Sequence, residues 1–91
     1  MARKGIFVLA FVHTEWRGTE KLYERRENMA AFTKENEAYD AAENEAERMK
    51  IAYDSRGWHT DDSDIAVGLM RYKNEFIDGT WNFYVDELPL D

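Results

Sequence analysis

The chain has 91 residues, 44% of them hydrophobic, and it carries 19 acidic against 12 basic side chains, which gives a net charge of −7. This length predicts one domain, residues 1–91, with a modest core, and the apolar content argues against intrinsic disorder. The absence of cysteine excludes disulfides and thiolate metal sites, and it fits a cytoplasmic protein.

The charge is distributed unevenly along the chain. Residues 1–33 carry six basic and four acidic groups, residues 34–56 carry four and seven, and residues 57–91 carry two and eight. Binding to a phosphate backbone requires clustered cations, and these are missing after the N-terminal third. The charge pattern therefore argues against direct nucleic-acid binding and favours a basic protein partner.

The first predicted element is a strand over residues 5–13, GIFVLAFVH, a continuous apolar run typical of a strand with a neighbour on each side. The run is too short to span a bilayer, and we do not interpret it as a signal peptide. Arg17-Gly18 is a turn candidate. Residues 19–32 contain good helix formers but a poor apolar stripe, so we expect a second strand there. If this segment is helical instead, the order becomes one strand, two helices and a hairpin.

A long amphipathic helix is predicted between Thr33 and Trp58, with Thr33 as the N-cap. We expect Gly57 to adopt the left-handed conformation after the C-cap and Trp58 to pack on Tyr53. Apolar residues recur every three or four positions and predict the buried stripe, which consists of Tyr39, Ala42, Ala46, Met49 and Tyr53, widened by Ala38 and Ala52.

After the helix, residues 59–64 (HTDDSD) are expected to form a loop, and Asp78-Gly79 predicts a two-residue hairpin turn. That turn would pair Ile77 with Thr80. The apolar face would then hold Met70, Tyr72, Phe76, Trp81, Phe83 and Val85, and the solvent face would hold Arg71, Lys73, Glu75, Asn82, Tyr84 and Asp86. The predicted fold is α+β: a two-layer sandwich of order ββαββ, with a four-stranded, mainly antiparallel sheet and one long helix on one face.

No local motif indicates a reaction, and we expect neither an enzyme nor a cofactor. His13 and His59 are not accompanied by a glycine-flanked nucleophile, and a strand histidine such as His13 beside Glu15 is more often structural. The HTDDSD segment contains oxygen and imidazole donors for a divalent cation, but its spacing is that of a solvated loop rather than an EF-hand. We therefore assign no metal site.

The helix carries a row of carboxylates opposite its apolar stripe. These groups span roughly 25 Å at 1.5 Å per residue, a pitch that can face an arginine-rich groove. Arg48 and Lys50 interrupt the row, with expected pairs Asn44–Arg48 and Glu47–Lys50. Ile51 projects among the charges and could anchor a contact. The predicted partner-binding residues are Glu37, Asp40, Glu43, Glu47, Ile51 and Asp54, extended by Asp61, Asp62 and Asp64.

A short, acidic, cysteine-free chain with the segment ENEAYDAAENEAE resembles the small inhibitors that bacteriophages and mobile elements encode against host defence, including anti-CRISPR proteins and DNA mimics. The resemblance rests on size, charge and organisation. It implies a stoichiometric binder that blocks a nucleic-acid-binding or effector surface, and it assigns no individual residues.

The sequence therefore predicts a non-enzymatic protein-binding module that occludes or mimics nucleic acid on a basic, nucleic-acid-handling partner, without membrane association. The alternative is a small homo-oligomeric α+β protein with a ligand-binding or catalytic cleft between subunits, using His13, Glu15 or Trp16. A third reading is an accessory subunit that docks through an exposed sheet edge. A homodimer is compatible with all three.

Overall fold

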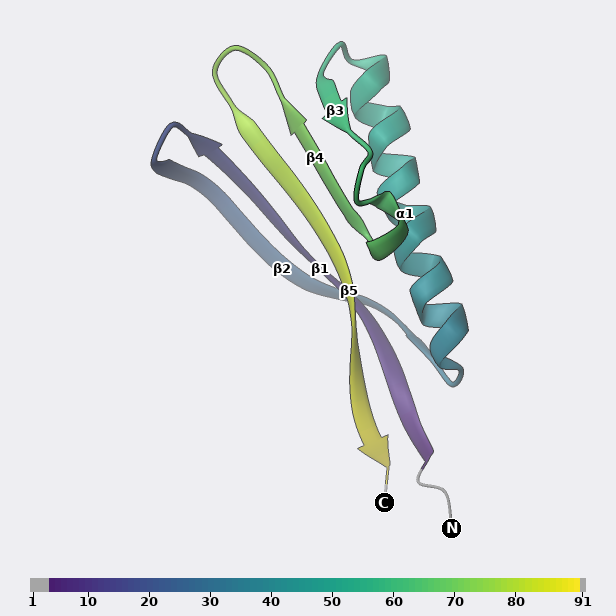
Figure 1. Cartoon of the computed structure of the whole chain (residues 1–91). Coiled ribbons are helices and arrows are strands. Elements are labelled where there is room, and N and C mark those ends of the chain that lie inside the picture. The colour runs from purple at the N-terminus through teal and green to yellow at the C-terminus, as the bar shows by residue number, and fades with distance from the viewer. Residues whose placement is uncertain (1–3, 91) are drawn as a thin grey trace.

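A computed structural model of the chain describes residues 4–90, and it shows a twisted sheet with one helix across one face (Figure 1). The elements are β1 (Lys4–Arg17), β2 (Glu20–Phe32), α1 (Glu35–Ser55), β3 (His59–Asp61), the 3-10 turn η1 (Ile65–Val67), β4 (Leu69–Lys73) and β5 (Asp78–Leu90). The sheet order is β2-β1-β5-β4-β3, and every paired neighbour is antiparallel. The α+β class and the single covering helix are confirmed.

The first two strands form a long hairpin, which confirms the strand interpretation of residues 19–32. Gly18 has φ of 61°, so glycine supplies the left-handed residue that the tight turn needs. The pairing of β2 with β1 slips twice, leaving Leu22 and Met29 as extra, bulged residues on β2. β1 lies between β2 and β5, as its apolar sequence predicts.

The helix begins one residue later than predicted. Lys34, not Thr33, occupies the N-cap position, and no side chain caps the first turn. The C-terminal prediction is confirmed: Gly57 has φ of 84°, the Trp58 amide donates to the Tyr53 carbonyl, and the two rings lie 5.8 Å apart. Together with the bond from the Gly57 amide to the Asp54 carbonyl, this is the Schellman ending.

The sheet has five strands, so the predicted four-stranded sheet of order ββαββ is wrong. The extra strand is β3, formed by the first half of the HTDDSD segment that was expected to be a loop. Thr60 points inward opposite Tyr72, while His59 and Asp61 stay exposed opposite Lys73 and Arg71. Three alternating residues are too few to distinguish a strand from a polar loop by pattern alone.

The hairpin register predicted from Asp78-Gly79 is also wrong. Both residues belong to β5, where Asp78 pairs with Lys73, and the turn runs through residues 74–77. The Asn74 side chain accepts hydrogen bonds from the amides of Phe76 and Ile77, an Asx arrangement that favours this turn. The observed pairing of β4 with β5 is shifted from the predicted one by an even number of residues. Each strand residue therefore stays on its predicted face of the sheet.

Because the faces are kept, the predicted apolar set is correct except for Phe76, which is 70% exposed at the hairpin tip. The helix stripe is correct for Ala38, Ala42, Ala46 and Tyr53, whereas Tyr39 is exposed. The core residues are Leu9, Phe11, Ala42, Ala46, Tyr53, Ile65, Met70, Tyr72 and Phe83. Among the described helical segments, none is both long enough and apolar enough to cross a membrane.

Close contacts at two glycines fix the packing of this core. A Cβ on Gly79 would lie 2.0 Å from a ring carbon of Tyr72, so the tyrosine ring can cross β5 only at a glycine. A Cβ on Gly68 would lie 2.2 Å from the carbonyl oxygen of Phe83, and Gly68 also has φ of 83°. The alanines on α1 similarly allow the helix to lie close to the sheet.

Candidate functional site

Four carboxylates project from the outer side of α1, away from the sheet, and we call them the acidic row: Glu37, Asp40, Glu43 and Glu47. Three of them are exposed and Glu43 is half-buried. Among the ion pairs of the described residues, none involves a member of the acidic row. Within the part of the chain that the structure describes, no cation is close enough to these four carboxylates to form an ion pair with them.

The two cations of the central helix pair differently from the prediction. Arg48 bonds to Glu45 at 2.6 Å rather than to Asn44, and Lys50 does not reach Glu47. The hydrogen bond with Glu45 raises the pKa of Arg48. Because Glu45 lies toward the sheet side of the helix, its pairing with Arg48 leaves the acidic row unneutralised.

Asp54, the last predicted carboxylate of the row, differs from the other four because it forms bonds within the fold. Lys50 bonds to Asp54 at 2.7 Å, and Thr60 of β3 donates a second hydrogen bond to the same carboxylate. These bonds, that from Lys50 foremost, lower the pKa of Asp54. Asp62 also contributes to raising the pKa of Lys50, although less than Asp54 does. Asp54 is therefore engaged in bonds within the fold, unlike the acidic row.

The aspartates of the 61–64 segment do not continue the row as a free acidic surface. Arg71 contacts Asp64 at 2.8 Å and Asp61 at 3.8 Å. Asp61 also accepts a bond from the Ser63 amide, which is the main reason that its pKa is lowered. Asp61 belongs to the face of the sheet opposite α1, because it pairs with Arg71. Asp62 is exposed, and no ion pair of the described residues includes it.

Ile51 lies on the same side of the helix as the acidic row, and 69% of its surface is exposed. A large apolar side chain within a charged surface can anchor a protein contact by filling a pocket on the partner. The structure thus places five of the nine predicted partner-binding residues on one outward helix face: the acidic row and Ile51.

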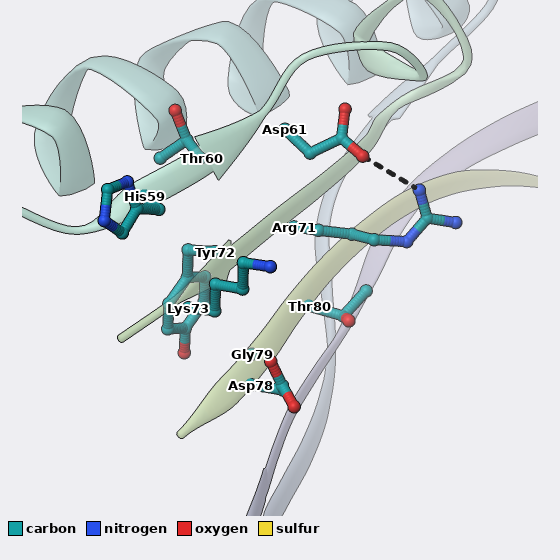
Figure 2. Close-up of a pocket in the computed structure, with 9 residues that line it drawn as sticks. All are labelled: His59, Thr60, Asp61, Arg71, Tyr72, Lys73, Asp78, Gly79 and Thr80. Carbon is teal, nitrogen blue, oxygen red and sulfur yellow. Dashed lines mark ion pairs between the residues drawn. The ribbon is translucent and has the colours of Figure 1, made fainter. Parts of the chain in front are cut away.

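A shallow cavity of about 320 Å³ opens near the end of the sheet where β3, β4 and β5 meet, and its lining residues are drawn in Figure 2. Arg71 reaches toward Asp61 on the neighbouring strand, so this cation of the cavity already has an ion-pair partner. His59 and Lys73 add polar groups from neighbouring strands. The lining contains both cations and carboxylates, so it does not form a uniformly positive or uniformly negative binding site.

Sequence reasoning missed a polar network beneath the helix. The Tyr72 hydroxyl donates to the Glu15 carboxylate and lies 2.7 Å from Nε2 of His13. The hydroxyl has one proton, which it donates to Glu15. In the bond between His13 and Tyr72, protonated Nε2 is therefore the donor and the hydroxyl oxygen is the acceptor. Burial, followed by the bond to Glu15, raises the pKa of Tyr72 well above its usual range, which keeps the phenol neutral.

Aromatic rings enclose this network. Trp81 stacks on His13 with ring centroids 3.9 Å apart, and Tyr53 stacks on Tyr72 at the same distance. Burial lowers the pKa of His13, although Glu15 acts in the opposite direction. Trp16 lies on the other face of the sheet, because successive residues of β1 alternate sides. Of the three residues named for the alternative cleft, His13 and Glu15 therefore share this network and Trp16 lies outside it.

The described residues contain no group of three or more histidine, aspartate or glutamate side chains placed to hold a metal ion. Comparison with protein-family models, with curated proteins and with solved structures finds no match for this chain.

Proposed function

We propose that the chain is a non-enzymatic protein-binding module, a small acidic inhibitor that occludes or mimics nucleic acid on a basic, nucleic-acid-handling partner. The supporting observation is the acidic row, four carboxylates without an ion-pair partner among the described residues. The two cations within α1, Arg48 and Lys50, bond to Glu45 and Asp54 instead, so neither forms an ion pair with the acidic row.

Charge complementarity of this kind mainly increases the association rate and selects the partner. The acidic row repeats along the helix axis at one-turn intervals, so a groove that binds a phosphate backbone can present arginines to it. Ile51 would supply apolar contact at the C-terminal end of this surface. Surface charges are screened over ~8 Å at physiological ionic strength, so the binding must weaken with salt.

A capture experiment with nucleic-acid competition tests the proposal. The immobilised chain is incubated with a host lysate at low and at high salt, and captured proteins are identified and purified. We expect a basic protein that elutes with salt and that double-stranded DNA or RNA displaces from the chain. A partner that binds the chain and nucleic acid simultaneously would contradict occlusion.

Two variants with the same change in net charge locate the surface. Neutralising the acidic row (Glu37→Gln, Asp40→Asn, Glu43→Gln and Glu47→Gln) should abolish capture. Neutralising four carboxylates elsewhere (Glu20→Gln, Glu75→Gln, Asp86→Asn and Glu87→Gln) should preserve most of it. Equal loss in both would show that overall charge, and not the helix face, determines binding.

The buried network favours a second candidate, a ligand-binding or catalytic protein. His13, Glu15 and Tyr72 form a connected chain of titratable groups, the kind of arrangement that supports proton transfer. His13 is half-buried, and Trp81 stacks on one face of its ring. Chemical-shift changes of the His13 ring on screening with a small-molecule fragment library would support this candidate, and shifts confined to α1 would oppose it.

A further inference from the structure

The outer edge of β2 is the longest stretch of backbone that the sheet leaves unpaired. β2 has thirteen residues, and β1 is its one strand partner among the described residues. All of its residues except Phe32 are exposed, and in Figure 1 the strand forms the border of the sheet farthest from β3 and β4. An edge strand of this length is a template for another strand.

Edge strands usually avoid such pairing through bulges and charged side chains. The bulges at Leu22 and Met29 bracket a regular window, residues 23–28, in which β2 pairs with β1 without interruption. Within the window the charges follow the order Glu24, Arg25, Arg26, Glu27. Arg25 and Glu27 lie two residues apart and therefore on the same face of β2.

Symmetry restricts how two copies can pair along this edge. An antiparallel pair of identical strands has a two-fold axis perpendicular to the sheet, so one residue lies opposite itself and its neighbours pair crosswise. With Arg26 on the axis, Arg25 of one copy lies opposite Glu27 of the other, and the reverse pair follows. Arg26 is also the midpoint of Glu20–Phe32, so this register overlaps the full strand.

The existing side-chain contacts suit this register. Arg25 and Glu27 already form an ion pair on the helix side of β2, since their β1 partners are His13 and Phe11. Pairing two edges would extend this bond into a network of four alternating charges. Arg26, which meets its own copy, has Glu24 3.8 Å away on the same face, so the two guanidinium groups would not meet unscreened.

We propose that the β2 edge is a self-association surface, at which two copies pair antiparallel about Arg26 and join their sheets. A two-fold axis perpendicular to the sheet keeps both α1 helices on the same side of the joined sheet. This inference is independent of the proposed function, because it concerns a different surface. A single strand pair buries little area, so the dimer should be weak and concentration-dependent.

Charge reversal across the axis tests the register. Sedimentation velocity over a concentration series should give a monomer–dimer equilibrium for the natural chain. Arg25→Glu or Glu27→Arg alone places like charges opposite each other twice and should weaken dimerisation on the order of tenfold or more. The double variant Arg25→Glu/Glu27→Arg restores opposite charges and should recover it. Arg48→Glu is the matched control, because it changes the net charge as Arg25→Glu does but lies on α1.

Backbone hydrogen exchange provides a second measurement that needs no variant. Amides of residues 23–28 that point away from β1 should exchange more slowly as protein concentration rises, while the amides of the exposed 74–77 turn should not change. A monomer at all concentrations, or a dimer that Arg25→Glu leaves intact, would overturn the proposal.

Discussion

The two faces of α1 differ in how their polar groups are paired. On the inner side, alanines and Tyr53 pack against the sheet, and the polar groups beneath them, His13, Glu15 and Tyr72, bond to one another. On the outer side, the acidic row has no ion-pair partners among the described residues. Unpaired charge is costly in a core but nearly neutral at a surface. The difference indicates that the inner face maintains the fold, whereas the proposed docking surface lies on the outer face, where the charges contribute little to stability.

The largest expected effect is on the inner side. Phe83→Ala removes a fully buried ring and should lower the free energy of unfolding by ~3–5 kcal/mol, measured by urea denaturation. Phe76→Ala is the matched control, because Phe76 is 70% exposed and its loss should be close to neutral. Similar losses for the two variants would show that the core does not lie where β4, β5 and α1 meet.

Gly79→Ala should destabilise the fold by ~1–3 kcal/mol, because the added methyl group overlaps the Tyr72 ring. The ring would have to move, which would also break the bonds to His13 and Glu15. Gly5→Ala is the milder control, since its nearest neighbour is the flexible Glu87 side chain at 3.2 Å. Urea denaturation measures both variants, and a Gly79→Ala protein as stable as the natural chain would contradict the described packing of Tyr72.

A smaller effect concerns pH. Burial lowers the pKa of His13 in the folded chain, whereas the unfolded chain keeps the ordinary value of about 6.5. Between the two values the unfolded state binds more protons, so this contribution to stability is complete above about pH 6.5 and is lost as the pH falls below it. His13→Gln should flatten that slope in denaturation curves recorded from pH 7.5 downward.

His59→Gln is the control for this pH dependence, because His59 is exposed on β3 and takes no part in the network. Its substitution should leave the slope unchanged. If the pH dependence of stability disappeared with His59→Gln and persisted with His13→Gln, its attribution to His13 would be contradicted.

The smallest effect on stability is expected on the outer side. Neutralising the acidic row should change the free energy of unfolding by less than about 0.5 kcal/mol per substitution, because these side chains form no ion pair with any other residue that the structure describes. Thermal melting of the combined variant measures this. A large drop in melting temperature would show that the row supports the helix and is not free for a partner.

Much of the fold follows from local pattern. The apolar run of β1, the helix stripe and the Gly57–Trp58 ending are each determined by residues close in sequence, and they were predicted correctly except for Tyr39 of the stripe, which is exposed. β3 escaped prediction because three residues carry too little periodicity. The β4–β5 register was wrong because the Asn74 side chain stabilises an earlier turn than Asp78-Gly79 would make.

The candidate sites show the same limit. The acidic row could be predicted because helical spacing determines which residues share a face. The bond from Thr60 to Asp54 and the pairing of Asp61 and Asp64 with Arg71 could not, because they depend on where Thr60 and Arg71 lie once β3 joins the sheet. The His13–Tyr72 bond joins residues 59 positions apart, and neither residue stands in a motif.

The most direct test of the central claim is the salt dependence of binding to the purified captured partner. The dissociation constant is measured over a salt series by isothermal titration calorimetry for the natural chain, the acidic-row variant and the control variant with the same net charge. The natural chain and the control should bind more weakly with increasing salt along similar slopes, while the acidic-row variant should bind weakly with a shallow slope. Equal slopes and affinities for all three proteins would contradict the claim that the outer face of α1 is the docking surface.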